Sequence, residues 1–127
     1  MAELEVHIIQ DQMARRMIEI GEVPVDIKNS AENVAVVVTQ SWCGDWKFMQ
    51  SWLTDGSTIG ADSDDMAIRV YTYEYDKTAM RTDFMQFKEG VWKNELIPYV
   101  RYYKKGSYIG DSNALGKDSF VSRFSEQ

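Results

Sequence analysis

The spacing of hydrophobic and polar positions predicts a strand and then a helix at the start of the chain. Apolar and polar residues alternate over residues 3–9, and a period of two is typical of a strand. Apolar residues then recur at helical spacing over residues 12–20. Asp11 stands where an N-terminal cap is expected, and Gly21 stands where the helix is expected to end.

The middle of the chain contains the clearest candidate for a central strand. Val34–Thr39 is a β-branched run without polar alternation, which is typical of a strand covered on both faces. Residues 21–33 before it form a polar connection, and residues 43–54 after it have a helical pattern. Alternation resumes over Ile68–Tyr75 and predicts a third strand.

The last third of the chain predicts a helix, a hairpin and a final helix. Residues 77–94 have a helical pattern, Pro98 opens two strands joined by a tight turn, and Asp118 or Ser119 caps the last helix. The order β-α-β-α-β-α-β-β-α predicts a single α/β domain over residues 1–127. We expect a central mixed sheet flanked by helices, mostly parallel and closed by one antiparallel hairpin.

Composition narrows the possible functions. The chain has 127 residues and a net charge of −6, so it lacks the basic surface that binds nucleic acid or anionic membranes. Its longest apolar run, Val34–Val38, is far too short to span a bilayer, and no basic leader is visible, so we expect a cytoplasmic protein. The chain has one cysteine, Cys43, and one histidine, His7. One cysteine cannot form an internal disulfide, and one cysteine with one histidine cannot provide the ligands of a structural zinc site. We expect no metal and no cofactor, and we place His7 on the polar face of the first strand.

An acidic cluster precedes the third predicted strand. Asp62, Asp64 and Asp65 begin like a calcium-binding loop. Ala67 and Tyr73 stand where that loop requires glycine and glutamate, so we interpret the cluster as a solvated loop.

The most informative stretch is Trp42-Cys43-Gly44, between the central strand and the next helix. A thiol at the first turn of a helix faces unpaired N–H groups, which favour the thiolate and predict a lowered thiol pKa. Lys47 adds positive charge one turn later, whereas Asp45 opposes the shift. The alternative is that Cys43 is an inert, partly buried small residue.

These residues resemble the thioredoxin family. Val34–Lys47 is similar to the second strand and active-site turn of that family, whose pattern is W-C-G-x-C-K. Ile97 and Pro98 are similar to the element in which a cis-proline faces the active-site cysteine, and residues 102–109 are similar to the family's hairpin. Asn113-Ala114 stands where the family often has Gly-Ala. The resemblance covers nearly the whole chain and implies a thioredoxin-like fold.

The sequence departs from the family at two positions that matter for chemistry. Trp46 replaces the second cysteine, and Val37 replaces the buried acid that is thought to assist that cysteine. The segments at residues 21–33 and 77–97 also look longer than in a minimal thioredoxin. Self-contained dithiol cycling is therefore excluded.

Two functions remain open. The first is a monothiol thiol–disulfide oxidoreductase, in which Cys43 attacks a protein or small disulfide and an external thiol, such as glutathione or bacillithiol, resolves the intermediate. The resemblance implies that Trp42, Gly44, Ile97 and Pro98 position the substrate. The second is a binding module that has kept the scaffold and lost turnover. Simpler explanations also exist for single residues, since Pro98 suits any strand start and the two tryptophans suit a core or an interface.

Overall fold

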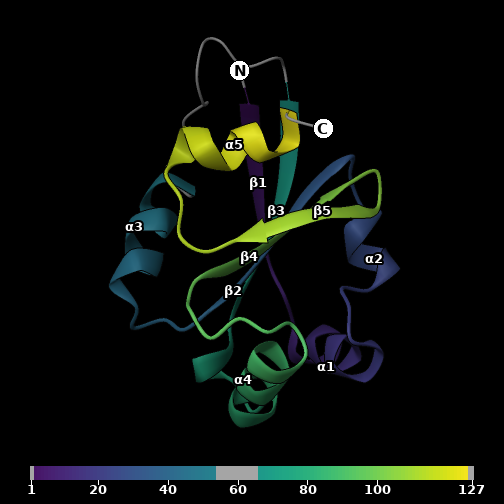
Figure 1. Ribbon diagram of the computed structural model, residues 1–127, viewed down its shortest axis with the longest axis vertical. Coiled ribbons are helices and arrows are strands. Elements are labelled where there is room, and N and C mark those ends of the chain that lie inside the picture. The colour runs from purple at the N-terminus through teal and green to yellow at the C-terminus, as the bar shows by residue number, and fades with distance from the viewer. Residues whose placement is uncertain (1, 54–65, 126–127) are drawn as a thin grey trace.

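The computed structural model describes residues 2–53 and 66–125 (Figure 1). The acidic cluster Asp62, Asp64 and Asp65 lies outside the described residues. The elements follow the expected order, with two short additional helices: β1 (Ala2–Ile8), α1 (Asp11–Ile20), α2 (Val25–Lys28), β2 (Asn33–Thr39), α3 (Gly44–Leu53), β3 (Met66–Glu74), the 3-10 helix η1 (Tyr75–Lys77), α4 (Arg81–Gly90), β4 (Tyr99–Lys104), β5 (Ser107–Ser112) and α5 (Lys117–Ser125).

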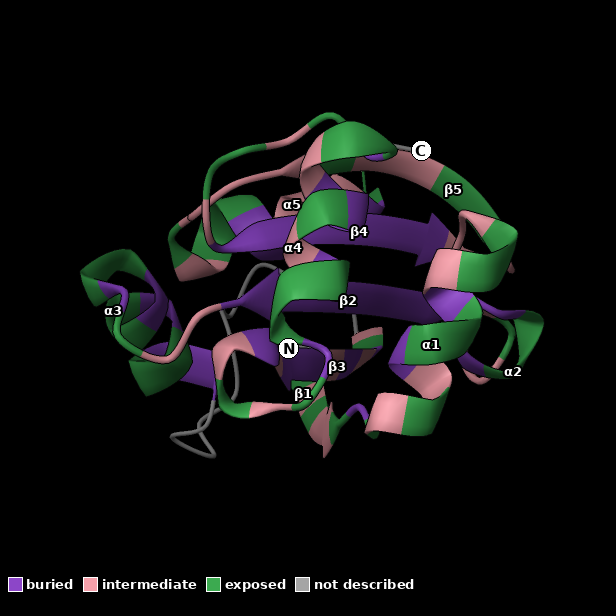
Figure 2. Cartoon of the chain, turned by 90° about the horizontal axis from the view of Figure 1, so that it is seen from below, coloured by how far each residue is buried: buried purple, intermediate pink, exposed green. Residues whose placement is uncertain are grey.

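The five strands form one mixed sheet in the order β1-β3-β2-β4-β5. β3 lies parallel to both β1 and β2, whereas β4 lies antiparallel to β2 and to β5. This arrangement confirms the expected mixed sheet closed by one hairpin. Two of its four strand pairings are antiparallel, so the sheet is not mostly parallel as expected. Every residue of β2 is buried, and Figure 2 shows the buried central strands between layers of helix.

Each face of the sheet has its own hydrophobic core. On one face, α3 and α5 pack against the strands, with Trp46, Met49 and Phe120 among the buried side chains. On the other face, α1, α2 and α4 pack against them, with Met17 and Phe84 among the fully buried side chains. Successive residues of a strand point to opposite faces, so β4 contributes Val100 and Tyr102 to the first core and Tyr99 and Tyr103 to the second.

Several element boundaries predicted from the sequence are wrong. The helix expected over residues 77–94 is instead η1 followed by α4, which ends at Gly90. The polar connection over residues 21–33 contains the single-turn helix α2. Short helices of this kind are too brief to produce a periodic signal.

Two predicted caps are also wrong, although Gly21 does end α1 with a left-handed φ of 75°. Asp11 lies inside the first turn of α1, where its carboxylate accepts a hydrogen bond from the Tyr73 hydroxyl at 2.9 Å. The last helix begins at Lys117, before both expected caps. The Asp11 carboxylate therefore binds Tyr73, a residue distant in the sequence, instead of capping the helix.

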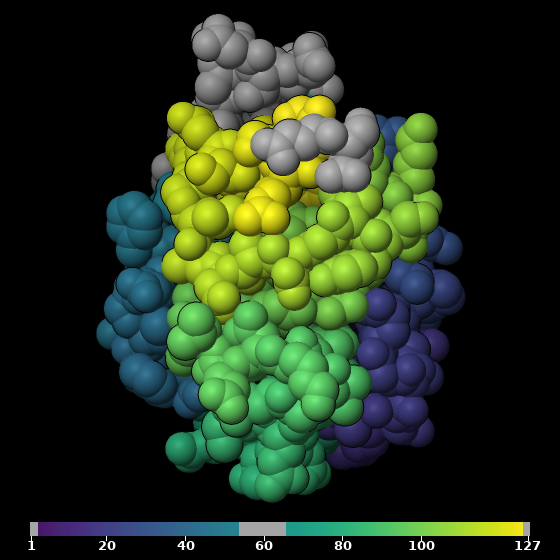
Figure 3. Space-filling model, viewed as in Figure 1, coloured from purple at the N-terminus to yellow at the C-terminus, as the bar shows by residue number. Residues whose placement is uncertain are grey.

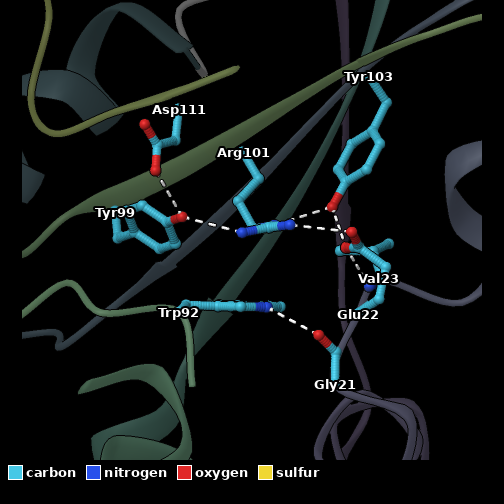
Figure 4. Close-up of polar contacts among 8 residues, drawn as sticks. All are labelled: Gly21, Glu22, Val23, Trp92, Tyr99, Arg101, Tyr103 and Asp111. Atoms are coloured by element: carbon cyan, nitrogen blue, oxygen red, sulfur yellow. Dashed lines mark hydrogen bonds and ion pairs between the residues drawn. The ribbon is translucent and has the colours of Figure 1, made fainter. Parts of the chain in front are cut away.

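A buried charged network joins the hairpin to the connection after α1 (Figure 4). The Arg101 guanidinium donates to Glu22 at 2.9 Å, to the Tyr103 hydroxyl at 2.9 Å and to the Tyr99 hydroxyl at 3.0 Å. Tyr103 donates to Glu22 as well, and Tyr99 donates to Asp111 at 2.8 Å. These contacts fasten β4 to a segment almost eighty residues away along the chain.

Electrostatics in this network favour the charged arginine and carboxylate. Burial raises the pKa of Tyr103, so its hydroxyl stays protonated and donates. Burial alone would raise the pKa of Glu22, but hydrogen bonds from Tyr103, the Val23 N–H and Arg101 outweigh it and lower the pKa. Glu22 therefore remains an anion opposite Arg101.

Neither membrane spans nor metal clusters are found in the part of the chain that the structure describes. No helix within residues 2–53 and 66–125 has the length and apolar character needed to cross a bilayer. The same residues contain no group of three or more histidine, cysteine, aspartate or glutamate side chains arranged to hold a metal ion.

Candidate functional site

Sheet topology brings three segments to one edge. β2 ends at Thr39, which pairs with Glu74 at the end of β3. β4 runs the opposite way, so its first residue, Tyr99, pairs with Val38 at the same edge. The segments that leave β2 and β3 and the segment that enters β4 therefore meet, and Cys43 lies at this meeting point.

Cys43 occupies the junction between β2 and α3. Its N–H donates to the Gln40 carbonyl at 3.3 Å, and its own carbonyl accepts the first helical hydrogen bond, from the Lys47 N–H at 3.0 Å. α3 begins at Gly44, so the thiol lies at the N-terminus of a ten-residue helix. Only 7% of Cys43 is exposed, and its Sγ donates to the Ile97 carbonyl at 3.7 Å.

The acceptor of the thiol hydrogen bond belongs to the Ile97–Pro98 element. The Ile97–Pro98 peptide bond is cis. Pro98 is buried and leads directly into β4, whereas Ile97 is partly exposed. Residues 54 positions apart in the sequence are thus in contact at the thiol.

The turn before Cys43 is held by residues that sequence reasoning missed. The Asp76 carboxylate accepts from the Ser41 N–H at 2.8 Å and from the Ser41 hydroxyl at 2.6 Å. Burial alone would raise the pKa of Asp76, but the two hydrogen bonds from Ser41 lower it below its ordinary value. Asp76 lies two residues after the end of β3, at the sheet edge where β2 also ends. That position was the sequence signal that could have identified it.

The two tryptophans beside Cys43 have opposite environments. Trp42 is 64% exposed, and its indole Nε1 donates to Gln40 at 2.8 Å. Trp46 is a buried residue of α3, 2% exposed, that packs in the core, and its indole Nε1 donates to Glu74 at 2.8 Å. Core packing therefore explains Trp46 and does not explain Trp42, which is largely exposed one residue before Cys43.

The remaining predicted site residues lie on the solvent side of α3. Asp45 and Lys47 are both exposed. A Cβ atom added to Gly44 would meet nothing within 4 Å, so open space adjoins the first residue of the helix. The structure thus brings Cys43 into contact with Ile97, the residue before Pro98, while the charged pair faces outward.

The arrangement limits the chemistry that the chain performs unaided. The sequence has one cysteine, so one mixed disulfide is the most that it forms with a partner. Trp46 has no thiol, and Val37 is a buried apolar residue of the same core. No side chain of this protein resolves a mixed disulfide at Cys43.

Comparison with known proteins bears on the fold. No protein-family model matches the sequence, and no curated protein matches it. Among solved structures, oxidised thioredoxin O1 from Arabidopsis thaliana matches with a TM-score of 0.57 and 14% identity, over 98% of this chain and 96% of that one. A thioredoxin from Malassezia sympodialis matches with a TM-score of 0.54 and 14% identity, over 97% and 89% of the two chains. Mitochondrial thioredoxin 3 from Saccharomyces cerevisiae matches with a TM-score of 0.50 and 14% identity, over 80% and 85%.

Identity is low in every case, so the likeness concerns the fold. The resemblance stated from the sequence is confirmed at that level: this chain has a thioredoxin-like fold.

Proposed function

We propose that this protein is a monothiol thiol–disulfide oxidoreductase that acts through Cys43 and depends on an external thiol. The observation that carries the proposal is the placement of the one thiol at the N-terminus of α3, in contact with the Ile97 carbonyl beside a cis-proline. Unpaired N–H groups at a helix N-terminus stabilise a thiolate, the form that attacks disulfides. Our proposed substrates are protein or low-molecular-weight disulfides.

The reaction has two balanced exchange steps. The Cys43 thiolate attacks one sulfur of a disulfide, forms a mixed disulfide with it, and releases the other sulfur as a thiolate. An external thiolate then attacks the substrate sulfur of the mixed disulfide, forms a new disulfide with it, and returns Cys43 to its thiolate form. The external thiol supplies the electrons, so we propose a reducing compartment such as the cytoplasm.

Four residues are proposed to position the substrate. Pro98 and Ile97 would align an extended segment beside the thiol, and the open space at Gly44 would admit it. The exposed ring of Trp42 would pack against it. Gln40 holds that ring in place by accepting the indole hydrogen bond, which limits the entropy lost on binding.

A turnover assay with a matched variant tests the proposal. The substrate is a peptide that carries glutathione as a mixed disulfide, and free glutathione is the resolving thiol. We expect wild-type protein to accelerate release of the peptide thiol and Cys43→Ser to give only the background rate. In parallel, alkylation of wild-type protein is followed against pH.

Two results together would contradict the proposal. One is equal turnover by wild type and Cys43→Ser, and the other is a Cys43 alkylation profile with its midpoint at about 8.5 or above, the value of an ordinary thiol. That outcome would favour the binding-module alternative.

A further inference from the structure

The segment between α4 and β4 carries the Ile97 carbonyl to the thiol, and it is fastened at several points. At its start, the Trp92 indole donates to the Gly21 carbonyl at 3.2 Å. In its middle, the fully buried Lys88 ammonium donates to the Asn94 carbonyl at 2.7 Å. These two bonds hold the segment against α1 and α4, on the face of the sheet opposite the thiol.

The third fastening point is Asn113, just after β5. Its side-chain amide forms a reciprocal pair with that of Asn94: Asn113 Nδ2 donates to Asn94 Oδ1 at 3.0 Å, and Asn94 Nδ2 donates to Asn113 Oδ1 at 3.3 Å. Asn94 Oδ1 also accepts from the Leu96 N–H at 3.0 Å. In the space-filling view, the green segment after α4 lies directly against the yellow-green end of the hairpin (Figure 3).

Asn113 also contacts the backbone on both sides of Ile97. Its Nδ2 donates to the Pro98 carbonyl at 3.1 Å and to the Leu96 carbonyl at 3.4 Å. The carbonyl between these two is that of Ile97, which accepts the hydrogen bond of the Cys43 thiol. One amide group therefore fixes the peptide units that flank the acceptor.

We infer that Asn113 is a positioning residue for Cys43, because it holds the Ile97 carbonyl against the thiol and Pro98 beside it. The role in catalysis rests on the proposed function, whereas the effect on the thiol itself does not. A carbonyl oxygen that accepts the S–H bond favours the thiol over the thiolate. Releasing the segment removes this acceptor and uncovers a sulfur that is now almost fully buried.

Two charge-matched variants test the inference. In Asn113→Asp, a carboxylate oxygen replaces the donor nitrogen, so the bonds that Asn113 Nδ2 donates to Pro98, Leu96 and Asn94 Oδ1 are lost. The new oxygen faces those three acceptor oxygens with a like partial charge, and only the bond donated by Asn94 Nδ2 remains. In Asn94→Asp, the carboxylate still accepts from Asn113 Nδ2 and from the Leu96 N–H, and Asn113 keeps its bond to Pro98. Both variants add one negative charge within the same hydrogen-bonded pair. An effect of charge alone would therefore change the rate of Cys43 alkylation similarly in both.

The readout is the rate of Cys43 alkylation by iodoacetamide as a function of pH. We expect Asn113→Asp to be alkylated about fivefold faster than Asn94→Asp at neutral pH, the change that corresponds to losing one ordinary hydrogen bond. We also expect the midpoint of its pH profile to lie lower. In the turnover assay, kcat/KM of Asn113→Asp should fall, because the segment that aligns the substrate is no longer fixed.

Equal alkylation rates and midpoints in the two variants would overturn the inference. Urea unfolding shows whether both variants are folded under the assay conditions. If Asn113→Asp does not fold, Asn113→Ala removes the same donors without charge, and a wild-type profile in that variant would overturn the inference instead. Wild-type protein without turnover, combined with a difference between the variants, would refute the proposed function and leave the positioning role standing.

Discussion

The Cys43 thiol and the Arg101 guanidinium lie on opposite faces of the sheet and differ in the number and length of their hydrogen bonds. On the face covered by α3 and α5, the Cys43 thiol makes one long contact, 3.7 Å, to the Ile97 carbonyl. On the face covered by α1, α2 and α4, Arg101 makes three hydrogen bonds of 2.9–3.0 Å. The thiol is thus held by one long polar contact, whereas the buried guanidinium is held by three short ones.

The difference indicates where the rigidity of the site comes from. Charge-assisted hydrogen bonds are about twice as strong as neutral ones. The Arg101 guanidinium also lies between two aromatic rings, 4.5 Å from the centre of Trp92 and 4.3 Å from that of Tyr108. Trp92 begins the segment that ends at Pro98, so contacts on the charged face support the position of the Ile97 carbonyl on the thiol face.

The largest effect is expected from breaking the charged network. Arg101→Met leaves the Glu22 carboxylate partly buried without its cation and removes the group between the two rings. Breaking a buried ion pair by removing one partner costs about 3–5 kcal/mol, and we expect a loss near 3 kcal/mol because Glu22 keeps its bonds from Tyr103 and Val23. Urea unfolding at pH 7 measures the change in the free energy of unfolding.

Arg16→Met is the matched control for that prediction. Arg16 pairs with Asp26 at 3.1 Å, but both side chains are largely exposed to solvent. An exposed pair contributes about 0–1 kcal/mol. A loss of stability in Arg16→Met equal to that in Arg101→Met would remove the proposed distinction between the charged network and ordinary surface pairs.

A smaller effect is expected at the turn before Cys43. In Asp76→Asn, one amide oxygen replaces a carboxylate that accepts two hydrogen bonds from Ser41, and we expect a loss of about 1 kcal/mol at pH 7. The folded-state pKa of Asp76 is lowered, so its contribution is complete above the unfolded-state pKa of about 3.9 and is lost as the pH falls through the lower, folded-state value. Unfolding of both proteins at pH 7 and pH 3 tests this, and a difference that stays constant between the two would contradict it.

The sequence was sufficient to predict the order of strands and helices because its strongest signals, apolar runs and alternation, extend over whole elements. The buried run Val34–Thr39 and the alternation at residues 3–9 correspond to β2 and β1, with small shifts at the ends. Short helices such as α2 produce no such signal. Asp11 was assigned to a cap because its partner, Tyr73, lies 62 residues away.

The candidate site was predictable only in part. Cys43 was predicted from its place at a strand-to-helix junction and Pro98 from a resemblance, and strand order explains why their segments meet. Asp76 and Asn94, which hold the segments around them, belong to no local motif, since each acts through a partner that only the folded chain brings near. Trp46 illustrates the same limit: its sequence position marks a missing cysteine, but its hydrogen bond to Glu74 depends on the packing of α3 against β3.

The central claim is that Cys43 forms a mixed disulfide that only an external thiol resolves. The most direct measurement is the intact mass of the protein after exposure to oxidised glutathione and then to excess reduced glutathione. The account predicts one glutathione adduct per chain, located at Cys43, absent from Cys43→Ser and removed by the reduced thiol. An unmodified wild-type chain after exposure to oxidised glutathione would contradict it.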